Sequence, residues 1–168
     1  MTTSVNLGIS TDAIASEIYA ASALRSLLSD GAAEQPLPVL SRDSRPALNI
    51  LIRDAYCRVA LMLAGHVASL DETGLAALGS DAGSQAVDGD IVLDLTLYTP
   101  RSWRHENAPA LCAAVVHAIA MTALDIAFTG VDHAAATRYE TLATQAVQSV
   151  ATLLCGTTLP PVLARHLL

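Results

Sequence analysis

The segment Asp90–Tyr98, DIVLDLTLY, constrains the fold of this chain more than any other part of the sequence. Every second residue in it is a large aliphatic one: Ile91, Leu93, Leu95 and Leu97. A period of two is typical of a half-buried β-strand. The other periodic segments are helical, so the backbone N–H and C=O groups of this strand need partners. We expect those partners in a weakly signalled strand elsewhere in the chain or in another subunit.

The composition favours closely packed helices. Hydrophobic residues make up 52% of the 168 residues and aromatic residues only 4%, so the apolar mass is mostly Ala, Leu and Val. Ala has the highest helix propensity and lets neighbouring backbones approach closely. The length is that of one domain with a core of its own.

Capping residues and apolar periodicity predict four helices. Their expected ranges are Ser10–Ser29, Asp43–Leu70, Asn107–Thr129 and His133–Leu154. Glycines follow the first, third and fourth helices, where a left-handed residue is useful. The link between the last two helices is very short, which predicts an antiparallel helical hairpin.

The region between the second and third helices is rich in Gly, Ser and Asp, which predicts a loop at 71–88. Within the chain, Gln85–Val87 or Leu37–Leu40 could pair with the strand. The predicted fold class is therefore mainly α, a four-helix, mostly antiparallel bundle with a small β-strand or hairpin insertion between helices two and three. A flexible N-terminus at 1–9 and a C-terminal tail at 157–168 complete one helical domain.

No motif in the sequence carries recognisable chemistry. The histidines lack the spacing of a helical metal site, and nucleophile elbows and Gly-rich phosphate loops are missing. We therefore expect a non-enzymatic protein with no catalytic residue, cofactor or metal. The net charge of −7 argues against specific nucleic-acid binding, which usually requires a basic face.

Cellular location follows from the cysteines and from the most apolar segment. Cys57, Cys112 and Cys155 form neither a CxxC pair nor a disulfide framework, which favours a reducing, cytoplasmic compartment. The start of the chain lacks the pattern of a secretion signal. Residues 108–130 are long and apolar enough to span a bilayer, but they contain His117 and Asp125. We expect a buried core helix there and no membrane contact.

Two polar clusters are candidates for protein contacts. Arg42 and Arg45 flank the start of the second helix, either as solvated capping charges or as a patch that pairs with partner carboxylates. Arg101, Trp103 and Arg104 follow the strand, and Trp and Arg are enriched in interface hot spots. Trp103 could instead close one end of the bundle. With the apolar strand residues, the candidate interface comprises Arg42, Arg45, Ile91, Leu93, Leu95, Leu97, Arg101, Trp103 and Arg104.

The order of elements, helices followed by a β excursion with a long loop and then a closing helical hairpin, resembles that of the small head–tail adaptor (neck or connector) proteins of tailed phages and prophages. The last helix, VDHAAATRYETLATQAVQSVATLL, resembles their terminal Ala-rich helix through Asp132, Arg138-Tyr139-Glu140 and Ala143. The resemblance covers residues 43–154. It implies a homo-oligomeric ring that contacts portal or tail components of the virion. The alternative is a helical binding or regulatory module of the bacterial cytoplasm.

Overall fold

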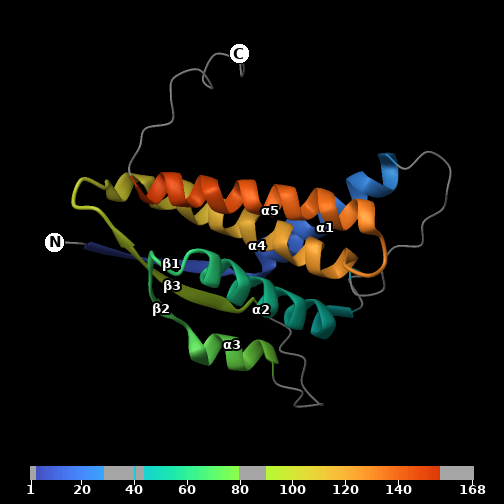
Figure 1. The fold of residues 1–168 in the computed structure, drawn as a ribbon. Coiled ribbons are helices and arrows are strands. Elements are labelled where there is room, and N and C mark those ends of the chain that lie inside the picture. The colour runs from blue at the N-terminus through green and yellow to red at the C-terminus, as the bar shows by residue number, and fades with distance from the viewer. Residues whose placement is uncertain (1–2, 29–39, 41–43, 80–89, 156–168) are drawn as a thin grey trace.

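The fold combines a small sheet with a set of helices. The computed structural model describes residues 3–28, 40, 44–79 and 90–155 (Figure 1). In chain order the elements are β1 (Thr3–Ser10), α1 (Thr11–Leu28), α2 (Arg45–Met62), β2 (Val67–Leu70), α3 (Glu72–Gly79), β3 (Val92–Thr99), the 3₁₀ turn η3 (His105–Asn107), α4 (Ala108–Phe128) and α5 (His133–Leu154). The strands form one antiparallel sheet in the order β1-β3-β2.

The predicted fold class is therefore wrong. The described residues form five α-helices and a three-stranded sheet rather than a four-helix bundle with a small hairpin insertion. The strand expected at Asp90–Tyr98 is present as β3, but it is the central strand and both of its neighbours belong to the same chain. Of the expected partners, Gln85–Val87 and Leu37–Leu40 lie outside the described residues except for Leu40, which is buried.

The first partner of β3 is β1, which occupies the segment predicted to be a flexible N-terminus. Its residues Val5, Leu7 and Ile9 alternate with small polar ones and are at most 3% exposed. They lie opposite Leu97, Leu95 and Leu93, respectively. Six aliphatic side chains therefore share the inner face of this strand pair. Burial of these side chains against one another stabilises residues 3–10 as a strand.

Hydrogen bonds at one corner hold the sheet and α1 together. The Thr11 amide donates to the Ile91 carbonyl (3.0 Å), and the Asp12 amide donates to the Asp90 carboxylate (3.0 Å). The Ser10 hydroxyl oxygen accepts from the Ala13 amide, so Ser10 caps the helix as its sequence predicts. Burial opposes ionisation of Asp90, but the hydrogen bonds from Asp12, Ser10 and Thr11 outweigh it and lower its pKa.

The second partner, β2, lies inside the range predicted for the second helix. Helix α2 ends at Met62, and the His66 carbonyl then accepts the Tyr98 amide of β3 (2.6 Å). Pairing with β3 thus overrides helix propensity in this segment. Helix α3 follows within the region predicted to be a loop, and its Gly74 amide donates to the Asp71 carboxylate (2.8 Å). This hydrogen bond is the main reason that the pKa of Asp71 is lowered.

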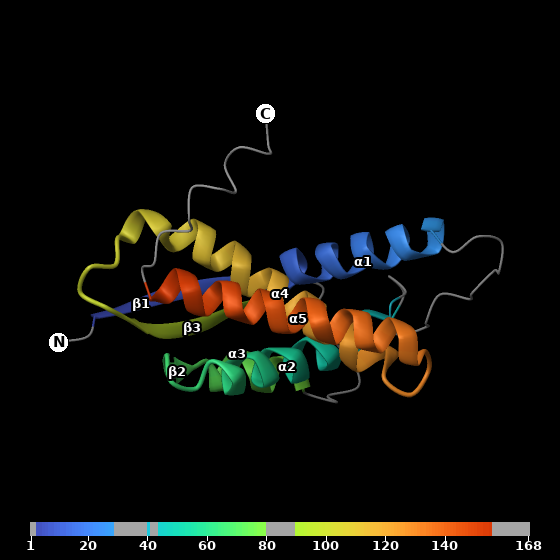
Figure 2. The same ribbon diagram turned by 45° about the horizontal axis from the view of Figure 1, so that its top comes forward.

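Helices α4 and α5 form the predicted antiparallel hairpin and lie side by side along their length (Figure 2). Gly130 turns the chain with a positive φ of 87°, which favours glycine. Asp132 caps α5 by accepting the amides of Ala134 (3.0 Å) and Ala135 (3.1 Å). The Asn107 side chain, expected to cap α4, makes no capping hydrogen bond.

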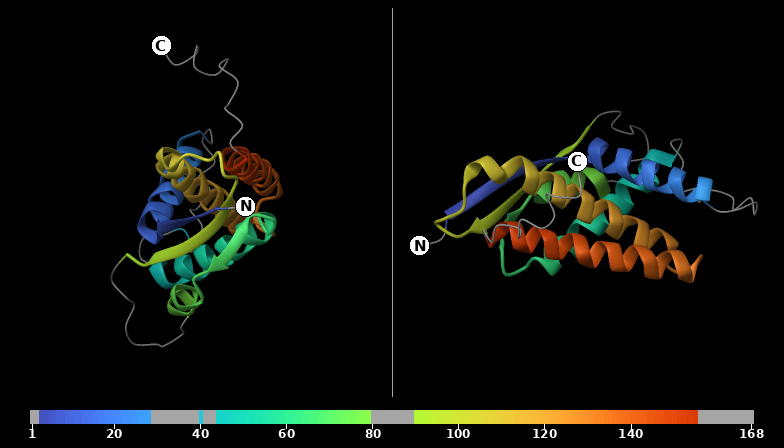
Figure 3. Two further views of the ribbon diagram at one scale, coloured as in Figure 1. Left: turned by 90° about the vertical axis from the view of Figure 1, so that its left-hand side faces the viewer. Right: turned by 90° about the horizontal axis from the view of Figure 1, so that it is seen from above.

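Helix α4 is the element on which the rest of the fold packs. Strand β1 lies beside its N-terminal half, where the Cys112 thiol approaches the Gly8 carbonyl at 3.6 Å. Helix α1 lies beside the middle and the C-terminal part of α4, and Glu17 contacts His117 at the middle (Figure 3). Helix α2 also packs against α4. Every residue of α4 from 118 to 125 is buried, as expected for a helix enclosed on several sides.

One of these buried residues, Asp125, is charged. Its side chain is 8% exposed and accepts a hydrogen bond from Arg58 of α2 at 2.9 Å. Burial raises the pKa of Asp125, the Arg58 guanidinium opposes this, and nearby Glu140 adds to it. The Arg58–Asp125 pair joins α2 to α4, ion pairs join α1 to α2 and to the N-cap residue of α5, and a Glu17–His117 hydrogen bond joins α1 to α4.

The inner and outer positions of β3 should differ sharply in their tolerance of a polar residue. We expect Leu93→Asn to lower the free energy of unfolding by about 4 kcal/mol, because it removes a buried side chain and buries an amide without partners. Val92→Asn is the matched control on the exposed face, with an expected change of about 0.5 kcal/mol or less. Chemical denaturation followed by circular dichroism measures both. Equal losses would contradict the assigned faces.

Asp125 should make stability depend on pH. Because its pKa is raised in the folded state, the folded protein binds a proton more readily than the unfolded chain does. The resulting stability is complete below the ordinary pKa of an aspartate and is lost as the pH rises through the raised value. Asp125→Asn lacks this contribution. We therefore expect the wild type to gain stability relative to Asp125→Asn as the pH falls from neutral toward about 4. A constant difference in denaturation midpoints would contradict this.

Candidate functional site

The aliphatic residues of the candidate interface lie inside the protein. Leu93, Leu95 and Leu97 are at most 1% exposed and pack within the core of their own chain. Ile91 is half-buried against the same core. The three leucines belong to the core of the folded chain and are not open to a partner, whereas Ile91 remains partly exposed.

The structure separates the two arginines predicted at the start of the second helix. Arg42 lies outside the described residues. Arg45 donates to the Asp12 carboxylate (2.5 Å) and to the Asn49 side chain (3.0 Å). Arg45 therefore ties α2 to the first turn of α1.

The segment after β3 divides its residues between the interior and the solvent. Trp103 is half-buried against the core, and its indole N–H donates to the Leu153 carbonyl near the end of α5 (3.1 Å). Its ring also lies 6.2 Å from that of His105. Arg101 and Arg104 are exposed. Trp103 thus closes one end of the helical hairpin, while the flanking arginines face the solvent.

The outer face of the sheet is a further candidate surface. We use this name for the solvent-facing residues of β1 and β3, namely Ser4, Asn6, Gly8, Val92, Asp94, Thr96 and Tyr98. Asp94 is the one charged residue in this set. Val92 is 53% exposed and Tyr98 is 45% exposed. The alternation of β3 predicts this face, but the β1 half depends on pairing between strands distant in sequence.

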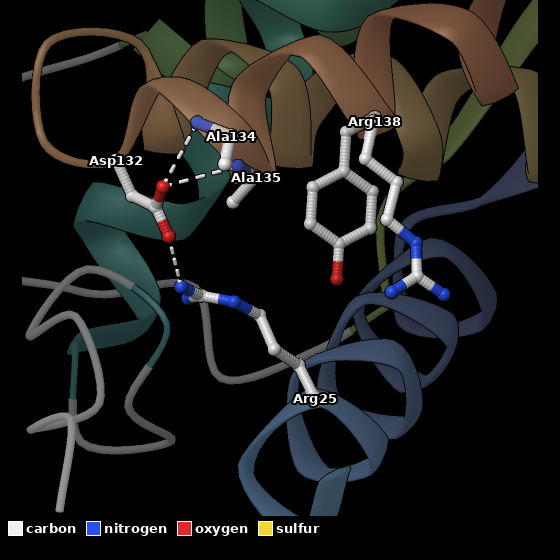
Figure 4. Close-up of a pocket in the computed structure, with 6 residues that line it drawn as sticks. Arg25, Asp132, Ala134, Ala135 and Arg138 are labelled. Carbon is white, nitrogen blue, oxygen red and sulfur yellow. Dashed lines mark hydrogen bonds and ion pairs between the residues drawn. The ribbon is translucent and has the colours of Figure 1, made fainter. Parts of the chain in front are cut away.

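A second candidate site is a cavity of about 220 Å³ between α1 and the start of α5. We call it the α1–α5 pocket; its lining residues are Arg25, Asp132, Ala134, Ala135, Arg138 and Tyr139. Figure 4 shows that Arg25 enters from α1 and Arg138 from α5, with Asp132 at one end. One Asp132 oxygen accepts the two helix amides, and the other pairs with Arg25.

Two stacked aromatic rings lie beside the pocket, and one of them, Tyr139, lines it. The Arg25 guanidinium carbon lies 4.3 Å from the centre of the Phe128 ring, a cation–π distance. Phe128 in turn stacks on Tyr139, with centroids 5.5 Å apart. Tyr139 is 6% exposed, and this burial raises its pKa, whereas the nearby Arg138 and Arg25 oppose the shift. Tyr139 is therefore a neutral phenol at neutral pH, able to donate a hydrogen bond.

Within the part of the chain that the structure describes, no three His, Cys, Asp or Glu residues lie close enough to hold a metal ion. The segment His105–Phe128 has the length and composition of a membrane span, yet 61% of its most apolar window is buried inside the protein. Length and composition alone fit a core helix equally well.

Comparisons with models of protein families, with curated proteins and with solved structures give no match to this chain. Its function must therefore be argued from the surfaces described above.

The position of Trp103 leads to a test of its role. We expect Trp103→Ala to lower the free energy of unfolding by about 2–3 kcal/mol, because it removes a half-buried ring and leaves the Leu153 carbonyl without its donor. Trp103→Phe keeps a ring and should cost about 1 kcal/mol. Circular dichroism is the measurement, since the substitution removes the chain's only tryptophan. A Trp103→Ala variant with unchanged stability would contradict the end-closing role.

Proposed function

We propose that this protein is a non-enzymatic structural or assembly protein, a head–tail adaptor subunit of a tailed phage or prophage that acts through self-association. The observation that carries the proposal is the outer face of the sheet. The residues proposed to make the contact differ from those expected from the sequence. The aliphatic residues of β3 are internal, and β3 has both of its strand partners within the chain.

The composition of the outer face supports a contact role. Interface cores are depleted of charge and enriched in aromatic residues and arginine. The chain has a net charge of −7, yet its outer face carries a single carboxylate, Asp94, beside the exposed Tyr98. Arg101 and Arg104 follow the Tyr98 end of β3 and are exposed, so they could pair with carboxylates at the rim of a contact.

The rigidity of this surface also supports the proposal. The outward residues of β3 alternate with Leu93, Leu95 and Leu97, which are at most 1% exposed, and β1 is held in register against β3 along eight residue pairs. A partner would therefore meet a preformed surface and would not have to order it on binding. A ring of such subunits needs a repeated contact of this kind.

The proposal is tested by placing a charge in the middle of the outer face. We expect the wild-type protein to form a discrete ring-sized species in multi-angle light scattering across a concentration series. Asn6→Arg should shift it to smaller species, because the new charge would be desolvated in the contact. Thr144→Arg, which puts the same charge on an exposed position of α5, is the matched control.

The control should assemble as the wild type does, and both variants should keep the wild-type circular dichroism spectrum. A wild-type protein that is monomeric at every concentration would contradict self-association. Equal loss of assembly in the Asn6→Arg and Thr144→Arg variants would contradict the assignment to the outer face.

A binding or regulatory module is the second candidate function. The observation that favours it is the α1–α5 pocket, because two arginines and a buried phenol converge there from helices distant in sequence.

A further inference from the structure

We propose that the α1–α5 pocket binds a small oxyanion, a phosphate or carboxylate group. This inference does not depend on the assembly role, since the pocket is lined by α1 and α5 and includes no residue of the sheet.

The charges lining the pocket favour an anion. Arg25 and Arg138 contribute two positive charges and Asp132 one negative charge, so the lining is net positive in a chain whose total is −7. The Asp132 carboxylate is already held by Arg25 and by two amides of α5. The positive end of the α5 dipole points to the same region and favours negative charge there.

Tyr139 is the independent observation that points to a ligand. The residue is 94% buried, since 6% of it is exposed, and it lines the pocket. Its hydroxyl has no hydrogen-bond partner among the described residues, although both Arg138 and Arg25 act on it electrostatically. Among the described residues, every fully buried polar side-chain atom has a hydrogen-bond partner. Because the Tyr139 hydroxyl has none, its oxygen must keep some accessible surface. A phenol donor is thus held open to the cavity beside two guanidinium groups.

This set of groups matches an oxyanion. A planar guanidinium can donate two parallel hydrogen bonds to a carboxylate or phosphate, and such charge-assisted bonds are about twice as strong as neutral ones. The phenol can donate a third bond to the same anion. Arg138 is exposed, so it can move onto the anion without breaking a buried contact. Arg25 is held in place by Phe128 and Asp132 and adds fixed positive charge.

The test is a titration with inorganic phosphate and, separately, with acetate, each against chloride at the same ionic strength. The amide resonances of Ala134 and Ala135 report on the pocket in a heteronuclear NMR spectrum of the full chain. We expect saturable shifts with one of the two anions. Tighter binding of phosphate than of acetate would identify a phosphate site. Tighter binding of acetate would identify a carboxylate site.

Three variants locate the binding. Arg138→Gln should weaken binding about tenfold by removing a charge-assisted pair. Tyr139→Phe keeps the ring that stacks on Phe128 and should weaken it about threefold. Arg53→Gln removes a charge on α2 that does not line the pocket and should leave the affinity unchanged. Shifts that never saturate, or equal affinities in all three variants, would overturn the proposal.

Discussion

The fold depends on strand β3 having hydrogen-bonding partners on both sides. A strand whose inner side chains are fully buried cannot leave its backbone N–H and C=O groups unpaired in the same environment without a large free-energy cost. The chain solves this by bringing β1 from its N-terminal residues and β2 from the residues after α2. Two segments far apart in the sequence are thereby tied to one strand. Helix α4 packs against β1, and α5 packs on α4.

This arrangement changes where a partner could bind. If β3 were an edge strand, its backbone would be a ready site for strand addition from another subunit. As the central strand it is unavailable, and the Cys112 thiol of α4 lies against the Gly8 carbonyl of β1. The outer face of the sheet remains exposed and offers side chains instead of backbone groups. The contact proposed for this protein therefore rests on side-chain complementarity at that face.

The two candidate surfaces differ in physical character and are independent of each other. The outer face of the sheet is almost uncharged and preformed, as expected for a surface that meets another protein. The α1–α5 pocket is small and positive, and its phenol and guanidinium groups suit an oxyanion. The Arg58–Asp125 ion pair lies apart from both surfaces and joins α2 to α4.

Local signals in the sequence were enough to locate α1, α4, α5 and β3, because each depends on its own periodicity and capping residues, such as Ser10 and Asp132. They were also enough to show that β3 needs partners. They could not name those partners, because Val67–Leu70 is only four residues long and Thr3–Ser10 has only three large aliphatic residues between small ones, and both are stabilised by pairing with β3. Likewise, the sequence marks Arg25 and Tyr139 only as residues of two helices. The tertiary structure decided that they share a pocket, since the contact spans more than a hundred residues and arises from helix packing.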